Sequence, residues 1–187
     1  MTRILGISGS LRKRSYNRAL LQAARELAPE GVEVEEFDLA AIPLFDPDVE
    51  ATGDPPPVAA LRDAVRNADA LLFATPEYNR GTSGVLKNAI DWLSRPAMAS
   101  VLRWKPVAVM GASTGRGGTR RAQQQVRDAL LFPGAIVLDE PEVAVPLAWE
   151  HFEEDGRLVN EKVRDSIRAL LEGLAAAPRA QHAAEAA

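Results

Sequence analysis

Cysteine is absent from the 187 residues of the chain. Its absence excludes disulfides, thiolate metal sites and a cysteine nucleophile, including the phosphate loop of the tyrosine-phosphatase type. Histidine is scarce, because only His151 and His182 occur. Neither lies near a nucleophile elbow in the sequence, so a serine–histidine–acid triad is poorly supported. We expect His151 to be an ordinary surface or subunit-contact residue.

Long hydrophobic runs are also lacking, and no segment approaches the roughly 18 to 20 apolar residues of a membrane helix. The sequence enters a strand pattern soon after Met1, with no apolar signal segment. The net charge of −4 gives no general reason to expect nucleic acid as a partner. With 47% hydrophobic and 26% charged residues, the composition is typical of one soluble globular domain, and we expect a cytoplasmic protein.

What the sequence does contain is an alternation of short apolar runs with helical patterns. The first expected strand begins at Ile4. The later strand patterns cover residues 32–38, 69–75, 106–112, 135–138 and 143–145. The expected helices cover residues 17–28, 58–68, 85–93, 120–132 and 159–174. This alternation predicts an α/β fold with a doubly wound, five-stranded parallel sheet in the flavodoxin-like order 2-1-3-4-5 and helices on both faces. We expect one domain over residues 1–174 and a frayed, disordered tail over residues 175–187.

A long connection over residues 39–57 contains five prolines. A connection of this length in a compact domain is usually functional or covers an interface. It carries the carboxylates of Asp46, Asp48, Glu50 and Asp54. The sequence lacks the glycine that a calcium loop requires, so we interpret these residues as a solvated acidic loop and expect no metal.

Three loops rich in glycine and small polar residues follow the first, third and fourth expected strands. They are loop one (residues 8–17), loop two (residues 76–84) and loop three (residues 113–119). Because the carboxyl ends of parallel strands share one edge of the sheet, the three loops should converge there, at the switch point where ligands bind.

Loop one suits a phosphate group. It leads from a strand into a helix, whose N-terminus carries a partial positive charge. Its hydroxyl, amide and cationic side chains are those of Ser8, Ser10, Arg12, Lys13, Arg14, Ser15 and Asn17. The dinucleotide fingerprint and the Walker A loop do not match this sequence. An ordinary strand-to-helix connection with solvated basic residues remains the alternative.

Loops two and three suit a flat heterocycle. Loop two combines backbone groups with the ring of Tyr78 and the amide of Asn79, a mixture that isoalloxazine would need. Tyr78 could equally be a half-buried aromatic residue without a ligand, and Glu77 is more simply a helix cap or an exposed residue than a base. Thr82 and Ser83 should cap the next helix. The residues of loop three are small enough to let a ligand approach its backbone closely. Three arginines in or beside this loop could contact a second anionic ligand, solvent or another subunit; they are Arg116, Arg120 and Arg121.

Three separated segments, in this order and spacing, closely resemble the NADPH-dependent FMN reductase family. They are residues 9–17 (GSLRKRSYN), residues 76–79 (PEYN) with 84–96 (GVLKNAIDWLSRP), and residues 118–123 (GTRRAQ) with Val126 and Arg127. The resemblance extends from Ile4 to roughly Val145, and the family includes quinone, chromate and azo-dye reductases. Ser83 departs from the family pattern, since many relatives have proline at this position, which leaves the rigidity of loop two in question.

The resemblance implies a set of site residues. The FMN phosphate would be held by Ser10, Arg12, Ser15, Tyr16 and Asn17. The isoalloxazine would be lined by Pro76, Glu77, Tyr78 and Asn79, with Ser113 on its far side. We expect Arg80 and Arg116 to attract the phosphates of the reductant. Because the flavin carries the chemistry, no side chain is expected to act as a nucleophile.

The resemblance also implies the reaction and the assembly. Hydride would pass from NADPH or NADH through FMN to a small-molecule acceptor such as a quinone, free flavin, azo compound or chromate. A homodimer or homotetramer is expected, with the 39–57 connection and helix 87–95 as candidate subunit contacts. Two alternatives stay open: an FMN-binding electron carrier or redox-sensing protein without substantial NAD(P)H turnover, and a flavin-free protein that binds another phosphorylated ligand.

Overall fold

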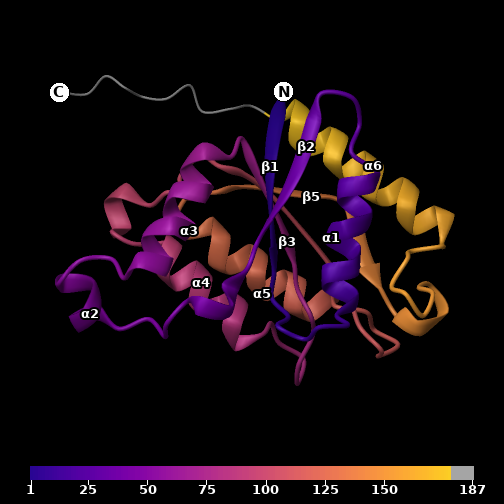
Figure 1. Cartoon of the computed structure of the whole chain (residues 1–187), viewed down its shortest axis with the longest axis horizontal. Coiled ribbons are helices and arrows are strands. Elements are labelled where there is room, and N and C mark those ends of the chain that lie inside the picture. Colours follow the sequence, from indigo (N-terminus) through magenta and orange to yellow (C-terminus); the bar gives the residue numbers. More distant parts are fainter. Residues whose placement is uncertain (178–187) are drawn as a thin grey trace.

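A five-stranded parallel sheet runs through the middle of the molecule (Figure 1). Its strand order is β2-β1-β3-β4-β5. This computed structural model describes residues 1–177. The strands are β1 (Thr2–Ser8), β2 (Val32–Phe37), β3 (Ala70–Ala74), β4 (Pro106–Ala112) and β5 (Ile136–Val145). Every residue of β3 and β4 is buried, as expected for central parallel strands covered on both faces. The predicted flavodoxin-like topology is therefore confirmed.

Helices cover both faces of the sheet. One face carries α1 (Tyr16–Glu26) and α6 (Glu161–Ala176). The other carries α3 (Pro56–Asn67), α4 (Gly84–Leu93) and α5 (Arg120–Leu131). Among the helices of residues 1–177, none combines the length and the apolar character that a membrane span requires.

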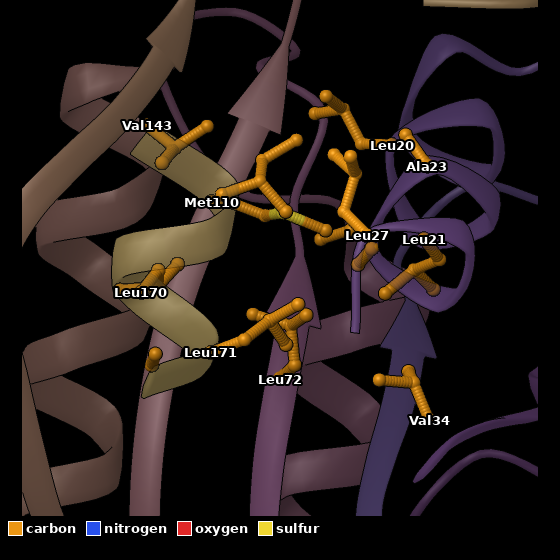
Figure 2. Close-up of a cluster of buried hydrophobic side chains, with 14 of the residues drawn as sticks. Leu20, Leu21, Ala23, Leu27, Val34, Leu72, Met110, Val143, Leu170 and Leu171 are labelled. Carbon is orange, nitrogen blue, oxygen red and sulfur yellow. The ribbon is translucent and has the colours of Figure 1, made fainter. Parts of the chain in front are cut away.

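The core on the α1 and α6 side is shown in Figure 2. Leu20 of α1, Leu27 directly after that helix and Leu171 of α6 belong to this cluster over the sheet. Beneath them lie Leu72 of β3 and Met110 of β4, both fully buried. Helix α1 is thereby fixed against the central strands, and its N-terminus stands at their carboxyl edge.

Three boundaries differ from the sequence prediction. Helix α1 is capped by Ser15, whose Oγ accepts from the backbone N–H groups of Asn17 and Arg18, so Asn17 is not the N-cap. The last helix begins after Asn160 and continues to Ala176, two residues into the expected tail. Residues 178–187 of that tail lie outside the described residues.

Strand β5 is one element and not two short runs. Its pairing with β4 shifts register, because Leu138 pairs with Ala108 whereas Val143 pairs with Met110. Residues 139–142 therefore bulge opposite a single residue of β4. The polar residues of this bulge interrupt the apolar pattern, which is why the sequence predicts two short runs instead of one strand.

The long connection after β2 folds against α4. It contains the short helix α2 (Pro47–Ala51) beside α4 in Figure 1. The Asn88 side chain accepts from Phe45 N–H (2.7 Å) and donates to the Pro43 carbonyl oxygen (2.8 Å), to which Trp92 Nε1 also donates (2.9 Å). Residues 1–177 contain no group of three or more histidine or carboxylate side chains placed for a metal ion.

Candidate functional site

A cavity of about 180 Å³ lies where loops one, two and three meet at the carboxyl edge of the sheet. Every residue predicted to bind the cofactor lines this cavity except Asn79. The lining consists of Ser10, Arg12, Ser15, Tyr16, Asn17, Pro76, Glu77, Tyr78, Ala112, Ser113 and Thr114. Residues nearly 100 positions apart in the sequence thus form one site, as the sheet order requires.

Hydrogen bonds of the Gly9 backbone hold loop one against β3 and loop two. Its N–H donates to the Ala74 carbonyl oxygen (2.9 Å), and its carbonyl oxygen accepts from Ser83 Oγ (2.7 Å). A Cβ at Gly9 would lie 2.8 Å from Ser83 Oγ and 3.0 Å from both Leu86 Cβ and Pro76 Cδ. Only glycine allows the two loops to approach this closely.

The phosphate-binding end predicted for loop one is built around the N-terminus of α1. The Arg12 side chain donates through Nε and Nη2 to the Arg14 carbonyl oxygen (3.0 and 2.7 Å). Its guanidinium carbon lies 5.9 Å from the ring centroid of Tyr16, whose ring is 5.2 Å from that of Phe152. The guanidinium is thereby held beside the helix N-terminus, an arrangement that favours an anion.

Hydrogen bonds from the Asn17 side chain stabilise the wall of the cavity. Its side chain is buried, and it both donates to the Ala112 carbonyl oxygen (3.0 Å) and accepts from Ala112 N–H (2.9 Å). The ladder between β3 and β4 ends at the pair Ala74–Met110, so no β3 residue lies opposite Ala112, which pairs with Val145 of β5 on its other side. The amide of Asn17 supplies the hydrogen bonds that a longer β3 would have made, and both of its polar atoms are engaged in doing so.

Loop two turns back as a tight hairpin. Tyr78 N–H donates to the Gly81 carbonyl oxygen (2.9 Å), and Gly81 N–H donates to that of Tyr78 (3.0 Å). Asn79 and Arg80 form its corner, both exposed and outside the cavity lining. Glu77 accepts from the first turn of α5, which confirms the helix-cap interpretation of this residue. Ser83 caps α4 through Leu86 N–H, as expected, whereas Thr82 does not cap this helix, because its Oγ1 bonds Thr75 Oγ1 at 2.9 Å.

Loop three is held against the end of β5 and by a hydrogen bond within the loop. Ser113 N–H donates to the Val145 carbonyl oxygen (3.0 Å), and Ser113 Oγ donates to that of Gly118 (2.7 Å). At Gly111, a Cβ would lie 2.3 Å from both the Thr75 carbonyl oxygen and Thr119 Oγ1. Arg116 is exposed and outside the cavity lining.

Two parts of this region are not predicted from the sequence. Ala112 and Thr114 line the cavity on either side of Ser113, and their positions at a strand end were the available signal. A larger groove of about 1080 Å³ shares Arg12, Ser15 and Tyr16 with the cavity and extends between α1 and residues 153–157. No motif in the sequence marks the acidic segment 153–155 as part of it.

Comparison with known proteins agrees with this architecture. The family model described as NADPH-dependent FMN reductase matches residues 2–150. The chain is 50% identical over 172 residues to an NAD(P)H-dependent FMN reductase of Pseudomonas aeruginosa, covering 92% of each protein. It is 40% identical over 169 residues to a quinone reductase of Pseudomonas putida, covering 90% of each.

A solved structure is similar along nearly the whole chain. It is the flavoenzyme NAD(P)H:(acceptor) oxidoreductase FerB from Paracoccus denitrificans, with a TM-score of 0.83 and 32% sequence identity. The match covers 93% of this chain and 95% of FerB. The sheet order, the three converging loops and these matches together show that the chain belongs to the NADPH-dependent FMN reductase family.

Proposed function

We propose that the protein binds FMN in the cavity formed by loops one, two and three and passes reducing equivalents from NAD(P)H to a small-molecule acceptor. The observation that carries this proposal is the convergence of nine predicted cofactor residues on one cavity. Family membership and the activities named for the relatives, FMN reductase and quinone reductase, support it.

The donor groups of the cavity fit FMN. At one end, the hydroxyls of Ser10 and Ser15, the guanidinium of Arg12 and the N-terminus of α1 offer hydrogen bonds and positive charge to a phosphate. At loops two and three, Pro76, Tyr78 and Ser113 provide apolar contact and polar groups for a flat ring. Bound FMN supplies the hydride-accepting and hydride-donating chemistry, and the side chains bind and orient the reactants.

The reductant would be recognised outside the flavin pocket. Arg80 and Arg116 are exposed on loops two and three, and neither forms part of the cavity lining. Such positions leave both guanidinium groups accessible to the phosphates of NADPH or NADH. The acceptor, a quinone, free flavin, azo compound or chromate, would then replace the nicotinamide in the same open site.

A homodimer or homotetramer in the cytoplasm is part of the proposal. The 39–57 connection and helix 87–95 offer the candidate contact surface, where Leu44 is 82% exposed. An exposed leucine beside a helix is suited to burial against a second copy of the chain.

The experiment that tests the function is an absorbance spectrum of the purified protein, before and after addition of FMN, followed by anaerobic NADPH and then NADH. A bound flavin band that the reductant bleaches, and that a quinone restores, is the expected result. A bound flavin that stays oxidised with both reductants would favour the electron-carrier alternative. Failure to take up FMN would refute the ligand assignment.

A further inference from the structure

The hairpin of loop two depends on contacts outside its own sequence. Asn79 and Arg80 at its corner have φ values of 50° and 65°. Positive φ at both corner residues is typical of a type I′ turn, in which glycine is the usual second residue. Arg80 carries a Cβ in this left-handed region, so its backbone is strained and must be held by surrounding groups.

Helix α5 holds both stems of this hairpin. Before the hairpin, Glu77 Oε2 accepts from the backbone N–H groups of Arg121 and Ala122, each at 3.2 Å. After the hairpin, Thr82 N–H donates to Gln125 Oε1 at 3.0 Å. The N-cap residue of α5 makes no side-chain cap bond of its own, so Glu77 supplies that cap from loop two.

Gln125 also packs directly on the hairpin. A Cβ placed on Gly81 would lie 2.9 Å from Gln125 Oε1, so the amide occupies the space beside the Gly81 backbone. The same oxygen therefore accepts from Thr82 and contacts Gly81, the residue that closes the hairpin with Tyr78. Gln125 is not among the residues that line the cavity.

We propose that Gln125 is a positioning residue for the flavin site, which holds the hairpin so that Tyr78 keeps its place in the cavity wall. The inference rests on the proposed function, because Tyr78 is a predicted flavin contact. Gln125 acts through Thr82 N–H and does not touch the flavin. Losing its side-chain acceptor releases the stem, and the strained corner can then relax away from the cavity.

The test compares the full-length protein with Gln125→Leu, which removes the acceptor and leaves an apolar side chain that is one atom shorter. Gln124→Leu is the matched control, because Gln124 is the neighbouring residue of the same helix and bonds only the exposed Asp128 at the surface. Gln125→Glu retains an acceptor oxygen at the same position along the side chain. The readouts are the FMN dissociation constant, kcat and KM for NADPH with a quinone, and hydrogen exchange at the Thr82 amide without FMN.

For Gln125→Leu we expect an FMN dissociation constant raised about fivefold and a Thr82 amide that exchanges at least about fivefold faster, as for the loss of one hydrogen bond. Gln124→Leu should leave both unchanged, and Gln125→Glu should restore both. An unchanged dissociation constant in Gln125→Leu, whatever its thermal stability, would overturn the positioning role. If the wild-type protein binds no FMN, the proposed function fails, whereas Thr82 exchange still decides whether Gln125 holds the hairpin.

Discussion

Replacing Asn17 by leucine should destabilise the protein even in the absence of any ligand. The buried Asn17 amide bonds both the N–H and the carbonyl oxygen of Ala112, at 2.9 and 3.0 Å. Two neutral hydrogen bonds contribute about 2 kcal/mol, and leaving their buried backbone partners unsatisfied adds about 1 kcal/mol or more. We therefore expect the free energy of unfolding to fall by about 3 kcal/mol, since leucine branches at Cγ as asparagine does but offers no polar atom.

Urea unfolding of the flavin-free protein measures this loss, and thermal unfolding should show a decrease of about 6–12 °C. Asn17→Asp should be at least as harmful at neutral pH, because a carboxylate oxygen would face the Ala112 carbonyl oxygen without a proton between them. Gln22→Leu, at an exposed position of the same helix, is the control and should change stability by less than about 0.5 kcal/mol. If Asn17→Leu is as stable as this control, the bridge to β4 does not stabilise the fold.

Four further substitutions, one of them a control, test other parts of the molecule. Arg12→Ala should raise the FMN dissociation constant at least about tenfold, as for loss of a charge-assisted hydrogen bond, and should lower the melting temperature of the flavin-free protein much less; unchanged FMN affinity would contradict the phosphate assignment. Gly111→Ala should lower the free energy of unfolding by about 3 kcal/mol or prevent folding, because its Cβ would lie 2.3 Å from the Thr75 carbonyl oxygen. Gly84→Ala, with nothing within 4 Å of the new Cβ, should change it by less than about 1 kcal/mol. Burial lowers the pKa of Lys105 below its ordinary 10.5, so the unfolded chain binds more protons between the two pKa values. Between about pH 8 and about pH 10, the free energy of unfolding of the wild-type protein should therefore rise relative to that of Lys105→Met. Urea unfolding at the two pH values measures this difference, and the same pH dependence in both proteins would refute the prediction.

The sequence carries the signals for the sheet and for the edge where the loops meet. The apolar runs of β3 and β4 are long enough and continuous enough to indicate strands buried on both faces, and the alternation with helices leaves few topologies. Polar loops after parallel strands must then gather at one edge. Local chemistry also predicts Ser83 as the cap of α4.

The remaining features depend on partners that are distant in the sequence. Asn17 has the residue type of a helix cap or a phosphate ligand, and nothing local indicates that its amide bonds Ala112, 95 positions later. Gln125 is one of three consecutive glutamines on a polar helix, and only the packing of α5 distinguishes it from Gln124. The bulge at residues 139–142 exists because β5 pairs with β4, so no pattern within β5 could predict it.

Ser83 shows how the three loops become one rigid frame. Where many members of the resembled family carry proline, this serine restricts the chain through hydrogen bonds: its Oγ donates to the Gly9 carbonyl oxygen and accepts from Leu86 N–H. Proline could make neither bond, because it has no hydroxyl group and restricts only its own φ angle. The serine therefore ties loop two to loop one, while Asn17 ties α1 to β4 and Gln125 ties loop two to α5. Because these bonds lie within the protein, the walls of the cavity are fixed before any ligand enters, which reduces the conformational entropy that binding must remove.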